Sequence, residues 1–169
     1  MTSPLQHMHD VLSRRPCIVG VGNTLRGDDG VGIKIIDCIE SATQSRGLTL
    51  IRAEDVVENF LNDIRESGSS EVLFIDAVTA ELEPGSVVFD EFEALEVGGG
   101  MLSTHRLTMN ISVNMLKNEG IKSYLLGVQA LDTGFGEGLT DPVDRAAELL
   151  IGYINDILEN ISQGDRHEF

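Results

Sequence analysis

Hydrophobic positions along the chain form two patterns, short continuous runs and longer stretches with helical spacing. Five runs predict β-strands, at 16–22, 48–53, 71–77, 86–90 and 123–129. Four of them are almost entirely apolar, which is typical of strands buried on both faces of a parallel sheet. Too few residues separate the 71–77 and 86–90 runs for a crossover helix. We therefore expect these two strands to form an antiparallel pair, with 86–90 at an edge of the sheet.

Apolar residues spaced three or four apart predict four helices between these strands, at 30–44, 55–66, 104–118 and 141–161. The last helix is expected to use Asp141 as its N-cap and Pro142 at its first position. The residues expected on the buried faces are Val31, Ile35, Ile36 and Ile39, then Val56, Phe60, Leu61 and Ile64, then Leu107, Ile111, Met115 and Leu116, and finally Val143, Ala147, Leu150, Ile154, Leu158 and Ile161.

This order of elements predicts an α/β fold, a three-layer α/β/α sandwich. Its core is a mostly parallel, twisted, five-stranded sheet with one antiparallel edge strand. A chain of 169 residues suits a single domain spanning 1–169. Within it we expect an unanchored N-terminal extension at 1–14 that includes His7 and His9, a folded domain at 15–162, and a frayed tail at 163–169.

Charge and composition narrow the functional classes. A net charge of −16 disfavours binding to nucleic acid or to an anionic membrane. The apolar runs are too short to span a bilayer, and the N-terminus lacks the features of a signal peptide. Cys17 and Cys38 lie in apolar runs and are expected to be buried and reduced, which indicates a cytoplasmic protein. No feature indicates an obligate interface, so we expect a monomer.

Candidate chemistry is expected beyond the carboxyl ends of the parallel strands, where such folds bind their ligands. The loop after the first strand contains Gly27-Asp28-Asp29-Gly30. It does not match a dinucleotide fingerprint, because Leu25 stands where the third glycine belongs. Two carboxylates at a helix N-terminus would also repel a pyrophosphate. Helix capping explains one aspartate and leaves the other for a different role.

Two further residues are expected at the same edge of the sheet. Asp76 follows four apolar strand residues, where a carboxylate must be paired, bind a cation or face a cleft. His105 is expected in the first turn of the 104–118 helix, capped by Ser103 or Thr104, where the helix dipole favours the neutral imidazole. Carboxylates and one imidazole suit a borderline metal ion. Capping, structural hydrogen bonding and packing remain the alternatives for these residues.

Four blocks taken together resemble the [NiFe] hydrogenase maturation endopeptidases. They are the loop 22–32, Asp76 in FIDAV, Pro84-Gly85 and Thr104-His105, and the resemblance covers about residues 16–155. It implies an endopeptidase, with its protease domain at 15–162, that removes a C-terminal extension from the precursor of a hydrogenase large subunit after nickel insertion. Details of these blocks look nearest to the proteases that serve formate-hydrogenlyase or energy-converting hydrogenases.

The resemblance also implies roles for individual residues. Asp29, Asp76 and His105 correspond to the catalytic, metal-contacting positions, with Asp29 where some members carry glutamate. The supporting residues around them are Gly22, Asn23, Asp28, Gly30, Gly32 and Thr104. The nickel is expected to be carried by the substrate, and no tightly bound organic cofactor is expected.

Two mechanisms and two other functions stay open at this stage. The metal can polarise the scissile carbonyl or activate water, or Asp29 or Asp76 can act as a general base. Outside proteolysis, the alternatives are a non-catalytic nickel-binding chaperone of the same fold and a phospho-receiver-like signalling domain. The receiver alternative is weakened because Lys122 precedes the last strand instead of following it.

Overall fold

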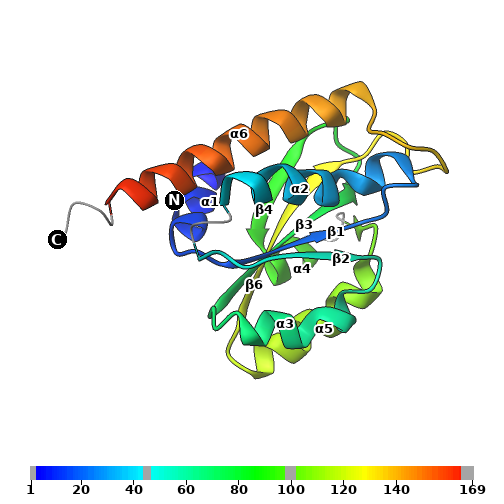
Figure 1. Cartoon of the computed structure of the whole chain (residues 1–169). Coiled ribbons are helices and arrows are strands. Elements are labelled where there is room, and N and C mark those ends of the chain that lie inside the picture. The colour runs from blue at the N-terminus through cyan, green and yellow to red at the C-terminus, as the bar shows by residue number, and fades with distance from the viewer. Residues whose placement is uncertain (1–2, 44–46, 98–101, 165–169) are drawn as a thin grey trace.

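The computed structural model describes residues 3–43, 47–97 and 102–164. Five strands form the main path of the sheet, in the order β2-β1-β3-β6-β4 (Figure 1). The four parallel strands are β1 (Cys17–Val21), β2 (Leu50–Glu54), β3 (Glu71–Thr79) and β6 (Lys122–Gln129). β4 (Val87–Glu91) is the antiparallel edge strand. The predicted fold class is confirmed.

Two details of the sheet differ from the prediction. β4 pairs with β6 and not with β3, because β6 lies between these two strands. The short strand β5 (Leu102–Ser103), which the hydrophobic pattern did not indicate, pairs antiparallel with the end of β3. This extra pairing matters for function, since it brings the residues just before His105 against the strand that carries Asp76.

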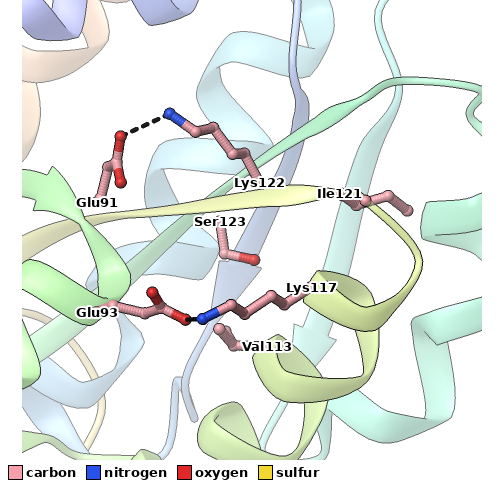
Figure 2. Close-up of a pocket in the computed structure, with 8 residues that line it drawn as sticks. Glu91, Glu93, Val113, Lys117, Ile121, Lys122 and Ser123 are labelled. Atoms are coloured by element: carbon pink, nitrogen blue, oxygen red, sulfur yellow. Dashed lines mark hydrogen bonds and ion pairs between the residues drawn. The ribbon is translucent and has the colours of Figure 1, made fainter.

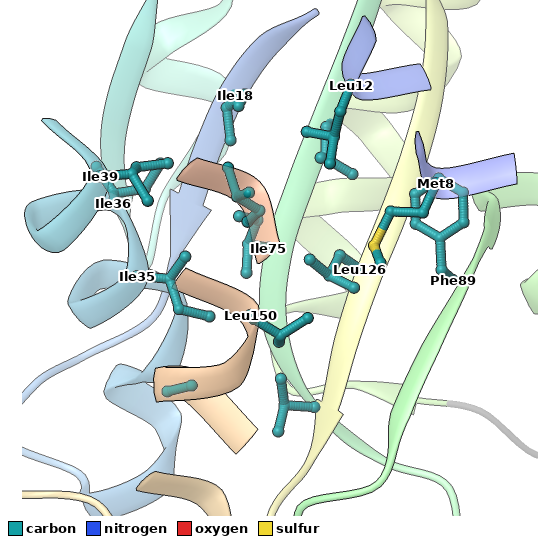
Figure 3. Close-up of a cluster of buried hydrophobic side chains, with 14 of the residues drawn as sticks. Met8, Leu12, Ile18, Ile35, Ile36, Ile39, Ile75, Phe89, Leu126 and Leu150 are labelled. Carbon is teal, nitrogen blue, oxygen red and sulfur yellow. The ribbon is translucent and has the colours of Figure 1, made fainter. Parts of the chain in front are cut away.

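Three helices cover one face of the sheet, α1 (Pro4–Ser13), α2 (Val31–Thr43) and α6 (Asp141–Gly164) (Figure 1). The buried faces predicted for α2 and α6 are confirmed, apart from Ile161, which is only partly buried. Figure 3 shows Ile35, Ile36 and Leu150 packed against Ile75 and Leu126 of the sheet. Burial of each large aliphatic side chain stabilises the fold by about 1.5–3 kcal/mol.

The N-terminal segment is not an unanchored extension. Ser3 caps α1, Pro4 opens it, and Met8, Val11 and Leu12 are buried between α6 and the edge of the sheet (Figure 3). The ring of His7 lies edge-on against Phe89 at a centroid distance of 5.3 Å. The prediction missed this because a ten-residue amphipathic helix depends on tertiary packing for its stability. At the other end α6 continues to Gly164, and residues 165–169 of the expected tail lie outside the described part.

The opposite face is covered by three helices, α3 (Leu61–Glu66), α4 (Phe92–Val97) and α5 (Arg106–Asn118). The helix expected at 55–66 is instead a 3₁₀ turn at Val57–Phe60 followed by α3, and Val57 is buried in place of Val56.

The predicted buried face of α5 is wrong for three of its four residues, and only Leu116 is buried as expected. Met109, Val113 and Leu116 face the core, whereas Leu107, Ile111 and Met115 are exposed. The helix has two apolar faces on nearly opposite sides, and hydrophobic spacing alone does not determine which of them packs on the sheet.

Two simpler expectations have different outcomes. Cys17 is buried in β1, but Cys38 is exposed on α2, so the expectation of two buried cysteines holds for the first alone. No helix in the described ranges is long and apolar enough to cross a membrane.

Candidate active site at the carboxyl edge of the sheet

The glycines of the loop after β1 let the chain fold back over the end of the sheet. Gly22 has a φ of 133°, and a Cβ there would lie 1.8 Å from the carbonyl oxygen of Asp29. A Cβ on Gly32 would lie 2.1 Å from the carbonyl oxygen of Ile75 in β3. A Cβ on Gly30 would lie 2.9 Å from the Cα of Thr24. These contacts give a physical reason for the supporting role predicted for the three glycines.

The Asp28 carboxylate links this loop by hydrogen bonds to the segment that follows β6. Its Oδ2 accepts hydrogen bonds from the backbone N–H groups of Leu131 (2.8 Å) and Asp132 (2.9 Å). Its Oδ1 accepts one from the backbone N–H of Thr140 at 2.7 Å, and the Thr140 hydroxyl donates as well. Helix capping is therefore the wrong interpretation for Asp28, which has a structural role. Asp29, the neighbouring aspartate, is therefore the one available to the candidate site.

Asp76 is fully buried near the end of β3, and three donors orient its carboxylate. The backbone N–H of Ala77 donates to Oδ1 at 2.8 Å, and the Thr104 hydroxyl donates to the same oxygen at 3.2 Å. The Ser103 hydroxyl donates to Oδ2 at 2.5 Å. The pairing of β5 with β3 supplies both hydroxyls, which explains how a carboxylate is tolerated among apolar strand residues.

His105 lies between the two remaining carboxylates. Its Nδ1 is 3.2 Å from Asp76 Oδ1, and its Nε2 is 3.6 Å from Asp29 Oδ2. Asp29 in turn accepts a hydrogen bond from the backbone N–H of Asn23 at 2.9 Å. One ligand atom from each of Asp29, Asp76 and His105 lies within 4.8 Å of the others. The structure thus brings together the three residues that the sequence analysis singled out.

The charge state expected for His105 is wrong. The residue occupies the N-cap position of α5, one residue before the first turn. Burial alone would lower the pKa of its imidazole, but the hydrogen bond to Asp76, the charges of Asp76 and Asp29 and the hydrogen bond to Asp55 raise this pKa from 6.5 to about 9. Without a metal the ring is an imidazolium at neutral pH, donating from both nitrogens. A metal that binds through this ring must displace its proton.

Asp55 is the site residue that sequence reasoning missed. Its Oδ1 is 3.0 Å from His105 Nε2, and its Oδ2 accepts a hydrogen bond from Asn23 Nδ2 at 3.1 Å. The residue directly follows β2, which neighbours β1 in the sheet. Its position at the carboxyl end of a parallel strand was the available signal. The predicted helix over 55–66 assigned Asp55 to a helix start instead, so its position at the end of a strand was overlooked.

The His105 geometry predicts an unusual titration. By ¹H–¹⁵N NMR of the imidazole we expect the pKa of His105 near 9, and a lower pKa in the Asp76→Asn variant, which removes the anion that raises this pKa most. Because this pKa is raised on folding, the group stabilises the folded state fully below about pH 6.5, and this contribution is lost as the pH rises through about 9. A pKa near 6.5 in the wild-type protein would contradict the described contacts. The exposed Asp156→Asn variant serves as the control.

Two hollows lie at opposite ends of the sheet. One, of about 240 Å³, adjoins the site and is lined by the loop after β1 and the end of β2, including Asn23, Leu25 and Asp55. The other, of about 220 Å³, lies at the amino end of β6 (Figure 2). There Lys122 pairs with Glu91 and Lys117 with Glu93, each at 2.7 Å. These two ion pairs involve all the charged side chains that line the second hollow, whereas the first hollow adjoins Asp55, which contacts His105.

Comparison with known proteins identifies the family of this chain. The model of the HycI hydrogenase maturation protease family matches residues 33–157, a range that includes Asp76 and His105 and begins four residues after Asp29. The hydrogenase 3 maturation protease of Escherichia coli K12 is 30% identical over 129 residues, which cover 76% of this chain and 81% of that protein.

Solved structures give the same result. The crystal structure of the [NiFe] hydrogenase maturation protease HycI from Thermococcus kodakarensis superposes with a TM-score of 0.77 at 26% identity, covering 90% of this chain and 99% of that one. The solution structure of the endopeptidase HycI from Escherichia coli superposes with a TM-score of 0.69 at 26% identity, covering 83% and 89% of the two chains. The protein is therefore a peptidase that belongs to the hydrogenase maturation protease family.

Proposed function

We propose that this protease removes the C-terminal extension of a [NiFe] hydrogenase large-subunit precursor after nickel has been inserted, and that it recognises the inserted nickel through Asp29, Asp76 and His105. The convergence of one imidazole and two carboxylates within 4.8 Å is the observation that carries this proposal. Family membership supports a precursor of this kind as the partner and excludes the phospho-receiver-like alternative.

The donor set suits nickel that already has other ligands. Imidazole nitrogen binds nickel well, and two carboxylates add charge without the thiolates that would compete for the ion. In this proposal the precursor keeps its own ligands on the metal, and the protease completes the coordination. The nickel is then substrate, and its presence positions the scissile bond relative to Asp29 and Asp76.

The charge state of His105 fits such a recognition step. Before the precursor binds, the imidazolium neutralises part of the negative charge of Asp29, Asp55 and Asp76. When nickel binds, the imidazole loses its proton. The positive charge of the metal then neutralises the carboxylates in place of the imidazolium. Hydrolysis then proceeds either with the metal polarising the carbonyl or with an aspartate as general base toward water. The hollow beside Asn23 and Asp55 is placed to accept residues next to the scissile bond.

A cleavage assay tests this function. A large-subunit precursor is co-expressed with the protease, with and without nickel loading, and processing is followed by the gel shift of the precursor. We expect processing of the nickel-loaded precursor alone. Processing that does not depend on nickel would retain the protease activity but remove nickel recognition from the proposal. Tight nickel binding without cleavage of any precursor would favour the chaperone alternative.

A further inference from the structure

The exposed apolar face of α5 has no partner within the described part of the chain. Leu107, Ile111 and Met115 recur every four residues and form one row along the helix. Leu107 is 80% exposed, although it is a large aliphatic residue. The opposite side of the same helix packs Met109, Val113 and Leu116 into the core, so this row is not needed to hold α5 in place.

The charge around this row distinguishes it from the rest of the surface. The protein carries 28 acidic and 12 basic residues, yet α5 contains no Asp or Glu among its thirteen residues. Each of the other α-helices in the described ranges contains at least one acidic residue. The residues beside the apolar row include the uncharged Asn114 and Asn118, both exposed, and Glu119, one turn beyond Met115, is already paired with Arg65. A partner can therefore cover this face without burying an unpaired carboxylate.

The row begins at the candidate active site. His105 is the N-cap of α5, and Leu107 is only two residues further along the chain. At 1.5 Å per residue, the row from Leu107 to Met115 extends about 12 Å away from the site along the helix. Val56 adds another exposed apolar side chain near the site, because it directly follows Asp55, which contacts His105.

The site itself offers a macromolecular substrate little contact area. Asp29 and Asp76 are buried, and the side chain of His105 is 11% exposed. Specific protein–protein interfaces bury about 800 Å² on each partner, and their fully buried core is more apolar than their rim. A substrate protein recognised here must therefore gain most of its interface from the surface around the site.

We propose that the row Leu107-Ile111-Met115 is the docking face for the large-subunit precursor, which would present an uncharged, apolar surface beside its nickel-bearing segment. This inference rests on the proposed function. It identifies the part of the protease that holds the body of the precursor, whereas the three site residues hold the metal. The docked precursor is then aligned so that its nickel reaches Asp29, Asp76 and His105.

The test is a double variant, Leu107→Gln/Ile111→Gln, assayed on nickel-loaded precursor. Glutamine has good helix propensity and both positions are exposed, so the fold and the melting temperature should be unchanged. We expect kcat/KM to fall at least about tenfold through a higher KM, with kcat at saturation unchanged. The matched control is Leu149→Gln, because Leu149 is 76% exposed on α6, on the opposite face of the sheet, and this variant should behave as wild type.

The other outcomes are distinguishable. A double variant within twofold of the wild-type kcat/KM would overturn the docking face and leave the proposed function intact. An equal loss in Leu149→Gln, or a loss in kcat at unchanged KM, would overturn it as well. A wild-type dimer that the double variant dissociates, seen by light scattering, would assign the face to self-association instead. Failure of the wild-type protein to cleave any precursor would refute the proposed function itself, and the docking proposal with it.

Discussion

Asparagine in place of Asp76 is expected to abolish processing of a nickel-loaded precursor while the protein stays folded. The substitution keeps the shape of a fully buried side chain but removes its charge. The Ser103 and Thr104 hydroxyls that contact it can rotate to donate or accept, so the local packing survives. The metal, however, loses an anionic ligand, and His105 loses the carboxylate that pairs with its Nδ1. We expect a loss of at least about a hundredfold in processing rate.

The gel-shift assay for Asp76→Asn should run beside Asp156→Asn, an exposed aspartate on α6, which is expected to process at the wild-type rate. Circular dichroism and the thermal midpoint of both variants establish that they are folded. Full activity of folded Asp76→Asn would remove Asp76 from the site. Loss of activity in both variants would show that the assay reports general damage.

The largest loss of stability is expected for Asp28→Asn. The carboxylate accepts three backbone N–H groups and one hydroxyl at a position with no exposed surface. An amide offers one acceptor oxygen and places its NH₂ group against N–H donors, so buried donors lose their partner. Each unsatisfied buried donor costs about 1–3 kcal/mol, and we expect unfolding free energy to fall by about 3–4 kcal/mol.

Urea denaturation at neutral pH measures this difference, and Asp37→Asn is the matched control. Asp37 is an exposed aspartate whose ion pair with Arg52 lies on the surface, so its loss should change the unfolding free energy by less than about 1 kcal/mol. Equal midpoints for Asp28→Asn and Asp37→Asn would show that the segment after β6 does not depend on the Asp28 carboxylate.

The sequence by itself determined the architecture, and with the family resemblance it singled out the three residues that the candidate site brings together. Strands β1, β3 and β6 contain continuous apolar runs, and helices α2 and α6 each have one apolar face. These local patterns therefore all agree with a buried sheet covered by helices. Asp76 was identifiable because a carboxylate at the end of a buried strand is costly without a role. The family resemblance, and not the local pattern, singled out Asp29 from Asp28 and added His105 to the set.

Tertiary structure decided the features that depend on contacts between distant segments: the buried face of α5, the roles of Asp28 and Asp29, and the pKa of His105. α5 carries two apolar faces, and the packing of the sheet, not the periodicity, selected Met109, Val113 and Leu116 for the core. Asp28 and Asp29 are adjacent and chemically identical, and their different roles follow from a loop more than a hundred residues away. The pKa of His105 is set by carboxylates from three other segments, which outweigh the effect of burial. Local sequence encodes periodicity and propensity, whereas the partner of a buried charge is a property of the folded chain.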